Sequence, residues 1–538
     1  MANIQLLDCT LRDGGYVNDW EFGFENLQNI FHRIVDAGVE IIEVGFIDER
    51  RPFDKNRSIG PNIECFNEIW ENTDKKSTMV VGMIDYGTCS IENLKKIEDS
   101  FLDGIRVIFK KHLMNEAMEF CRQVKELGYK VFAQLVSITS YTQEELLEVI
   151  QLANDIEPYA ISIVDTYGLL YPEDLLHYYK ILDENVKENI HIGFHAHNNL
   201  QLAFANSMIF ANNSSKHGLI VDATLHGMGK SAGNAPIELV AKRLNEVAGK
   251  KYNISYLLEA IENNIMDFYK KTPWGYKMFF YLSGKNQCHP NYVSYFKETQ
   301  NFSVAKIDKL LSEIEPNEKK LLYDKTIAER MYNEYCTKEV NDNVTLELFK
   351  EEIKRRQVLI IGPGKNIKLQ ENWVQQFIKE NRPYIIAINY IPDGIDVDCV
   401  FVTNIRRYSK LKDRLNTKLD VKIMATTNVE TMGKKFEYII NREPLLEKQE
   451  LINDNSFLML LKILEKIDVK KVFCAGLDGY SETEDNYLDP KMEYYFIKDV
   501  AGQLNRHMRA FIENIRNEMD ITFLTYSHYD QKGPAIWS

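Results

Sequence analysis

The sequence is poor in cysteine and has no long hydrophobic run. Its eight cysteines are scattered over 538 residues without a CxxC pair, a pattern too sparse for a disulfide scaffold and too dispersed for a zinc ribbon. The longest apolar runs, such as residues 358–362, have the length of strands, and none approaches the roughly 20 residues that span a bilayer. The N-terminus has no basic leader followed by an apolar stretch. We therefore expect a cytoplasmic protein without a membrane span.

Basic residues are also in deficit. Lys and Arg number 65 against 79 Asp and Glu, which gives a formal net charge of −14. Because nucleic-acid binding needs clustered Lys and Arg to contact phosphates, such a chain is a poor general binder of DNA or RNA. A hydrophobic fraction of 45% with 27% charged residues is typical of a folded globular protein. At about 150 residues per domain the length suggests three or four units, although one barrel can use about 250.

Short apolar runs alternate with amphipathic segments over residues 1–250. Segment 25–38, for example, places Leu27, Ile30 and Ile34 on one helical face and ends at a glycine. Eight such strand–helix units with continuous hydrophobic strands predict an α/β fold, a closed parallel (β/α)8 TIM barrel. The alternative is an open doubly wound sheet. The predicted strands are residues 4–9, 40–46, 78–84, 104–109, 130–136, 160–165, 190–195 and 219–225.

Two further regions follow the predicted barrel. Residues 251–350 have the composition of a helical extension. Residues 351–538 resume the alternation of strand and helix patterns, which predicts an open α/β domain of the Rossmann-like type. Its predicted strands lie at 358–364, 384–390, 399–404, 421–427, 470–479 and 521–526.

Two histidines end the seventh predicted barrel strand. His195 and His197 alternate along the strand, so both imidazoles can face one point in the barrel mouth. Asp13, on the loop after the first strand, can reach that point because the strands close on each other. Two histidines and one carboxylate leave coordination positions open, as a catalytic divalent metal requires. Asn234 lies in a glycine-rich loop that either approaches this metal or only turns a corner into a helix.

Other charged residues sit at the same end of the barrel, where such folds place chemistry. Arg12 stands beside Asp13 and can stabilise an enolate, or can form a salt bridge that closes the barrel. Glu43 is either a buried partner of Arg12 or a residue that orients the site. A loop at 47–58 carries four basic side chains, which are either solvated or contact an anionic substrate. They are Arg50, Arg51, Lys55 and Arg57.

Five motifs carry a family resemblance. LDCTLRDGG, EVGF, VDTYG, HAHNN and GMGKSAGNAPIE, in this order over residues 1–300, resemble the pyruvate-carboxylate/HMG-CoA-lyase-like metal-dependent barrels, in particular the 4-hydroxy-2-oxovalerate aldolases. The resemblance implies Mn²⁺ or Mg²⁺, with Zn²⁺ as a further choice. It also implies a reversible bond between a pyruvate enolate, stabilised by Arg12, and an aldehyde. We expect a homodimer. The implied metal ligands are Asp13, His195, His197 and Asn234.

The sequence departs from those aldolases at one catalytic position. They carry a histidine four residues after the motif arginine, whereas this chain has Tyr16. A tyrosine is a weak base unless its pKa is lowered. The base therefore stays open between Tyr16, His226 and metal-bound water. Two other functions also stay open, namely the condensation of an acyl-CoA with a 2-oxo acid, as in isopropylmalate synthases, and a catalytically degenerate binding module.

A glycine turn opens the C-terminal region. IIGPGKNI (360–367) can hold a phosphate on backbone amides, although it is neither a GxxxxGK[ST] nor a GxGxxG motif. With VFVTN and FCAGLDGYS it resembles MptE-like and sialyltransferase-like domains. The resemblance implies a nucleotide or nucleotide-sugar site and a role in carbohydrate or surface-glycan biosynthesis. The pocket would be lined by Gly362, Gly364, Asn389, Asn404 and Asp478.

Overall fold

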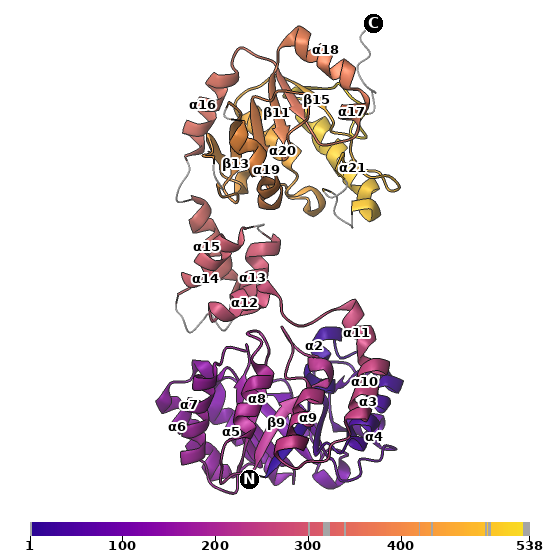
Figure 1. The fold of residues 1–538 in the computed structure, drawn as a ribbon, viewed down its shortest axis with the longest axis vertical. Helices are drawn as coiled ribbons and strands as arrows, with labels where there is room; N and C mark the ends of the chain where they lie inside the picture. The colour runs from indigo at the N-terminus through magenta and orange to yellow at the C-terminus, as the bar shows by residue number, and fades with distance from the viewer. Residues whose placement is uncertain are drawn as a thin grey trace. The chain divides into compact units, whose positions relative to one another are not determined.

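A computed structural model describes residues 3–299, 302–315, 323–337, 341–418, 420–431, 434–489, 492 and 497–530 (Figure 1). The chain forms two compact units. One contains Met1–Val293 and Leu311–Tyr323, and the other contains Ser294–Leu310 and Asp324–Ser538. The segment predicted as a helical extension, residues 251–350, is thus shared between them. Within the described ranges, no helix is long and apolar enough to cross a membrane.

The first unit is a closed parallel barrel. Strand β1 pairs in parallel with both β2 and β9, so the sheet closes on itself. This closure confirms the predicted TIM barrel and excludes the open sheet. A short strand, β3 (Ile59–Gly60), adds to the edge of β2. The barrel strands are β1 (Ile4–Asp8), β2 (Ile41–Ile47), β4 (Met79–Asp85), β5 (Gly104–Phe109), β6 (Lys130–Leu135), β7 (Ala160–Asp165), β8 (His191–Ala196) and β9 (Leu219–Ala223).

Amphipathic helices cover the outside of the barrel. Helix α3 buries Leu27, Ile30 and Ile34, the face that the sequence predicted. Between β4 and β5 the described chain makes two short 3-10 turns in place of an α-helix, at Ile91–Asn93 and Ile97–Asp99. The outer helices are α3 (Phe24–Asp36), α4 (Ile63–Trp70), α5 (Met114–Glu126), α6 (Gln143–Ile156), α7 (Pro172–Asn185), α8 (Ala203–Ala211), α9 (Ile237–Val247) and α10 (Ile254–Ala260).

Helices also make up most of the chain between barrel and second sheet. Lys306 on α14 donates a hydrogen bond to the carbonyl oxygen of Thr427 at 2.9 Å, within the second compact unit. The helices are α11 (Met266–Lys271), α12 (Met278–Lys285), α13 (Pro290–Ser294), α14 (Val304–Ser312), α15 (Lys325–Thr337) and α16 (Asp342–Ile353).

The second unit contains an open parallel sheet in the order β14-β13-β12-β11-β10-β15-β16. Separate buried clusters cover its two faces, so the predicted open α/β domain is confirmed. The strand order reverses direction between β10 and β15, the place where such sheets bind ligands. The strands are β10 (Val358–Ile361), β11 (Tyr384–Ile388), β12 (Cys399–Val402), β13 (Lys422–Thr426), β14 (Tyr438–Ile440), β15 (Lys471–Ala475) and β16 (Asp520–Phe523). The helices are α17 (Asn366–Leu369), α18 (Glu371–Asn381), α19 (Ile405–Thr417), α20 (Ser456–Lys466) and α21 (Ile497–Ile515).

Candidate active site

Asp13, His195 and His197 converge at the mouth of the barrel. The Oδ2 atom of Asp13 lies 3.1 Å from Nε2 of His195 and 3.6 Å from Nε2 of His197. All three side chains are buried, and their ligand atoms lie within 4.8 Å of one another. Two imidazoles and a carboxylate at this spacing are a donor set for a divalent metal.

Local structure explains this convergence. Asp13 ends the one-turn helix α1 (Thr10–Asp13) directly after β1, and His195 lies on β8 with His197 just beyond it. An isolated bridge pairs His197 with Asn234. The amide of Asn234 donates to Oδ2 of Asp13 at 2.9 Å. The glycine-rich loop thus both turns a corner and brings Asn234 to the site.

Two orphaned oxygen atoms fit a cation at this point. Oδ1 of Asp13 and Oδ1 of Asn234 are buried without a hydrogen-bond partner, and a buried oxygen left unpaired is costly. Burial lowers the pKa of His197 to about 4, so its imidazole is neutral and free to bind a metal. Burial alone would raise the pKa of Asp13, but Arg12 and both histidines hold it well below its usual value.

His195 is oriented by a second carboxylate. Its Nδ1 lies 2.9 Å from Oδ2 of Asp222, which leaves Nε2 toward Asp13. Cys9 also approaches, with Sγ 4.0 Å from Nδ1 of His195. Burial raises the pKa of the Cys9 thiol well above its usual value, so this sulfur is protonated and is a poor metal ligand. The geometry therefore favours Asp13 over Cys9 as the third ligand.

Glu43 holds Arg12 from inside the barrel. Nε of Arg12 donates to Oε2 of Glu43 at 2.7 Å, and Arg106 donates to the same oxygen at 3.0 Å. Arg106 also pairs with Asp222. Glu43 is fully buried and does not line the cavity above it. The structure therefore makes Glu43 the buried partner that holds Arg12 in place.

A cavity of about 500 Å³ opens above these residues. Tyr16 lines it beside Phe46, with the ring centroids 6.2 Å apart. Although 42% of the side chain is exposed, desolvation of the hydroxyl raises the pKa of Tyr16, so the phenol keeps its proton at neutral pH. The cavity is lined by Arg12, Asp13, Tyr16, Met83, Asp85, Ile108, Phe109, Lys110, Gln134, Val136, Val164, Thr166, Tyr167, His195, His197, Lys230, His289 and Tyr323.

The structure does not bring His226 to this cavity. Its ring packs edge-on against Tyr269 and Trp274, at centroid distances of 5.1 and 6.0 Å. Trp274 donates to its backbone carbonyl at 2.8 Å. The sequence placed His226 after the last strand, but the backbone there turns through a left-handed conformation (φ 53°) that points the side chain elsewhere. His226 is therefore no candidate base in this geometry.

Three arginines of the basic loop after β2 are paired with acidic side chains. Arg50 contacts Asp48 at 2.6 Å, while Arg51 and Arg57 both contact Asp19, at 2.8 and 2.5 Å. None of them lines the cavity. The lysines that do line the cavity, Lys110 and Lys230, come from other loops.

The barrel sequence matches a known protein family. Residues 3–263 match the HMGL-like family model. This match confirms the resemblance that the motifs predicted for the barrel. The predicted MptE-like resemblance of the C-terminal domain stays a prediction.

Three similar proteins illustrate the range of this likeness. A 4-hydroxy-2-oxovalerate aldolase from Geobacillus genomosp. 3 is 26% identical over 45% of this chain and 71% of its own. A 2-isopropylmalate synthase from Staphylococcus carnosus is 28% identical over 45% of this chain and 48% of its own. The crystal structure of the N-terminal domain of a putative aldolase from Bacteroides vulgatus is 22% identical, at a TM-score of 0.48. It covers 57% of this chain and 99% of that one.

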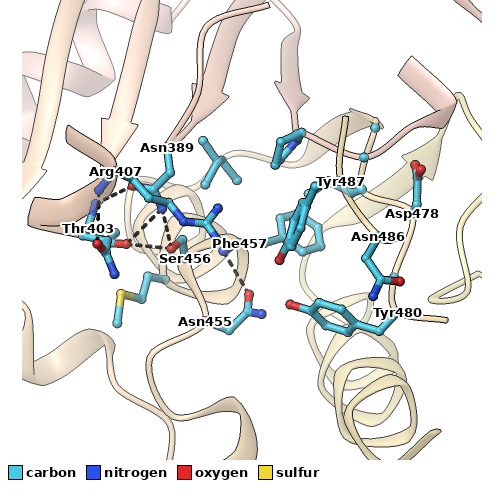
Figure 2. Close-up of a pocket in the computed structure, with 18 of the residues that line it drawn as sticks. Asn389, Thr403, Arg407, Asn455, Ser456, Phe457, Asp478, Tyr480, Asn486 and Tyr487 are labelled. Atoms are coloured by element: carbon cyan, nitrogen blue, oxygen red, sulfur yellow. Dashed lines mark hydrogen bonds between the residues drawn. The ribbon is translucent and has the colours of Figure 1, made fainter. Parts of the chain in front are cut away.

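A second cavity lies at the reversal point of the C-terminal sheet (Figure 2). Of the five residues predicted there, Gly364, Asn389, Asn404 and Asp478 line it. Gly362 does not, because it lies against the neighbouring loop, where a Cβ atom would come within 2.5 Å of the Gly476 carbonyl oxygen.

An acidic side chain occupies the predicted phosphate-binding turn. Oδ2 of Asp478 accepts a hydrogen bond from the backbone amide of Asn366 at 2.8 Å, and a Cβ atom on Gly364 would meet Asp478 at 2.4 Å. The glycine therefore serves close packing of two loops. A phosphate at this amide would face a carboxylate.

Arginines and aromatic rings offer another place for an anion in the same cavity. Arg407 lies over the ring of Tyr487 at 5.3 Å, and Arg442 is buried 4.0 Å from the carboxylate of Asp454. Figure 2 shows Tyr480 and Tyr487 on the side of Asp478. The sequence did not single out these two arginines, because no motif distinguishes them from the other arginines of the chain.

Proposed function

We propose that the barrel is a divalent-metal-dependent enzyme that forms or cleaves a carbon–carbon bond between a pyruvate-type enolate and an aldehyde. The observation that carries this proposal is the grouping of Asp13, His195, His197 and Asn234 beside Arg12 in one cavity. The HMGL-like match and the aldolase relative support the same reaction class. Mn²⁺ or Mg²⁺ suits the oxygen-containing donor set, with Zn²⁺ as the alternative.

The protein's own residues have distinct tasks in this reaction. Bound to this site, a divalent ion would act as a Lewis acid that polarises the 2-oxo group. Arg12, held by Glu43, would donate hydrogen bonds to the carboxylate and enolate oxygens. Tyr16 would give its proton to the aldehyde oxygen as the new bond forms, and would take it back during cleavage.

The cleavage direction offers a direct assay. Purified protein with Mn²⁺ should convert 4-hydroxy-2-oxovalerate into pyruvate and acetaldehyde, and EDTA should stop it. Asp13→Ala and His197→Ala should lower turnover by at least about a hundredfold, since each removes a metal ligand. His177→Ala, on the outer helix α7, is the matched control and should behave as wild type. Full turnover in Asp13→Ala would contradict the proposal.

The isopropylmalate synthase relative supports a second candidate, condensation of an acyl-CoA with a 2-oxo acid. This reaction releases free coenzyme A, whose thiol can be titrated. Thiol release from acetyl-CoA that depends on a 2-oxo acid, without aldol cleavage, would favour the condensing enzyme.

We propose further that the C-terminal cavity binds a nucleotide or a nucleotide-linked sugar, as carbohydrate or surface-glycan assembly requires. Arg407 and Arg442 would hold the phosphates, and the tyrosines would pack on a ring. UDP or CMP should then protect this domain from proteolysis, while inorganic phosphate alone should protect it less. Arg407→Ala should remove the protection. Equal cleavage with and without every nucleotide tested would contradict this site.

A further inference from the structure

Two lysines, Lys110 and Lys230, line the barrel cavity. Lys230 follows β9 in the glycine-rich loop and is partly buried, while Lys110 directly follows β5 and is exposed. The described residues include no hydrogen-bond acceptor or ion-pair partner for either ammonium group. The nearest aromatic contact of Lys230 is the ring of Tyr16, at 5.3 Å. Ordering a partly buried cation without a partner is costly, so an unpaired one beside a cavity points to an anionic ligand.

The charge of the cavity supports this conclusion. Its lining contains three cationic side chains, Arg12, Lys110 and Lys230, but only two carboxylates, Asp13 and Asp85. The proposed metal would add two positive charges, and one pyruvate would neutralise only one. This excess is local, because the whole chain carries a net charge of −14.

The first substrate does not account for the lysines. Arg12 lies 3.6 Å from Asp13 and is held there by Glu43, so the oxygens of a 2-oxo acid at the metal already meet a guanidinium. Both lysines interact electrostatically with Asp85 at the end of β4, the strand beside β5, and Lys230 also interacts with Asp13. Both line the same cavity as the proposed metal ligands without belonging to them, so they are placed for the part of a ligand that extends beyond the metal.

We propose that Lys230, assisted by Lys110, binds a terminal carboxylate or phosphate carried by the acceptor aldehyde. This inference rests on the proposed aldol function and names its substrate class. It makes Lys230 a specificity residue that contacts the substrate away from the reacting carbon atoms.

Matched aldehydes test it. With pyruvate and Mn²⁺, kcat/KM would be compared for succinic semialdehyde against butanal, and for glyceraldehyde 3-phosphate against glyceraldehyde. Wild type should prefer the anionic member of at least one pair by about tenfold or more, the usual worth of a charged hydrogen bond. The favoured pair distinguishes carboxylate from phosphate.

Variants attribute the preference to its residue. Lys230→Met should abolish the anionic preference and Lys230→Arg should retain it. Lys110→Met should weaken it less, because Lys110 is more exposed. Lys242→Met, which removes an exposed lysine paired with Glu246 on α9, is the control and should keep the wild-type ratio. Because each ratio is measured within one protein, a general loss of activity cancels.

Two results would overturn the inference. The first is a wild-type protein that exchanges the methyl protons of pyruvate but uses both members of each aldehyde pair equally well. This result would leave the proposed aldol function intact. The second is a full anionic preference in Lys230→Met. A wild-type protein that neither exchanges those protons nor forms an aldol product contradicts the proposed function itself, and the inference with it.

Discussion

At the scale of single residues, the site depends on charges buried inside the barrel. Arg106 is 1% exposed and is paired with Glu43 and Asp222, which in turn contact Arg12 and His195. One buried network thus orients both Arg12, the proposed enolate-binding residue, and His195, a proposed metal ligand. Removing one member leaves a buried charge uncompensated, which is more damaging than losing a surface pair.

Glu43→Gln should therefore destabilise the barrel and impair catalysis together. We expect the free energy of unfolding to fall by about 3 kcal/mol, because two buried guanidinium groups each lose one of their carboxylate partners. We also expect kcat to fall, because Arg12 loses its fixed orientation. Urea unfolding and steady-state kinetics would measure both. Glu246→Gln, which breaks an exposed pair on α9, should change neither, and wild-type unfolding of Glu43→Gln would refute the network's role.

Metal affinity should depend on the protonation of His195. Burial alone would lower the pKa of His195, but hydrogen bonds to Asp13 and Asp222 raise it above its ordinary value of about 6.5. Below that raised pKa a proton competes with the metal, so affinity should fall by up to about tenfold per pH unit as the pH decreases. The pKa of His197 is about 4, so its imidazole is already neutral at the pH values where His195 gains its proton.

Calorimetric titration with Mn²⁺ between pH 8.5 and 5.5 would show this competition. Asp222→Asn should move the decline to lower pH, because it removes the carboxylate that favours the protonated imidazole. An affinity that stays constant from pH 8 to pH 6 would contradict the assignment of His195 as a ligand.

At the scale of elements, close approach of two loops shapes the C-terminal cavity. The turn after β10 meets the turn after β15 at the reversal point of the sheet, where Gly364 packs on Gly476 and Asp478. Glycine is needed at this position because a side chain would collide with Asp478. The carboxylate of Asp478 is held there by a hydrogen bond from the backbone amide at the start of α17. We therefore propose the arginines of the same cavity, in place of this turn, as its phosphate-binding groups.

Gly364→Ala should destabilise the C-terminal domain by about 1–3 kcal/mol, the usual cost of overpacking. Its added methyl group would meet the Gly476 carbonyl oxygen at 2.6 Å and the Asp478 carboxyl carbon at 2.4 Å. Gly502→Ala on α21 is the control, since its methyl group would meet only the mobile end of Glu482, and alanine favours a helix by up to about 1 kcal/mol. A stability loss as large as that of Gly364→Ala in the control would contradict this explanation.

At the scale of the whole molecule, two compact units each have their own buried clusters. The strand runs were predictable because parallel strands buried on both faces are continuously hydrophobic. The meeting of the two histidines of HAH with the aspartate of the RD pair was likewise predictable. Alternation along a strand turns both histidines to one side, and closure of the barrel brings the two motifs together. The orientation of His226 was not, since it depends on one left-handed residue. Arg106 had a signal, a single charge within an apolar run, but its partners lie far away in sequence.

Because the proposed metal ligands all lie within the barrel unit, Mn²⁺ should stabilise that unit alone. At a hundredfold excess over its Kd, a ligand bound only by the folded state adds about 2.7 kcal/mol. Differential scanning calorimetry should show one transition moving to higher temperature with Mn²⁺ and returning with EDTA. His197→Ala should lose the shift, and an unchanged wild-type profile with every divalent ion would contradict the metal site.

The central claim is that this barrel turns pyruvate into an enolate on a metal. Proton NMR of pyruvate with purified protein and Mn²⁺ in deuterated water tests it without the aldehyde. We predict loss of the methyl signal as deuterium enters, no loss with EDTA, and no loss in Asp13→Ala or His195→Ala. A methyl signal that persists with Mn²⁺, Mg²⁺ and Zn²⁺, or that decays equally fast in Asp13→Ala, would contradict the account.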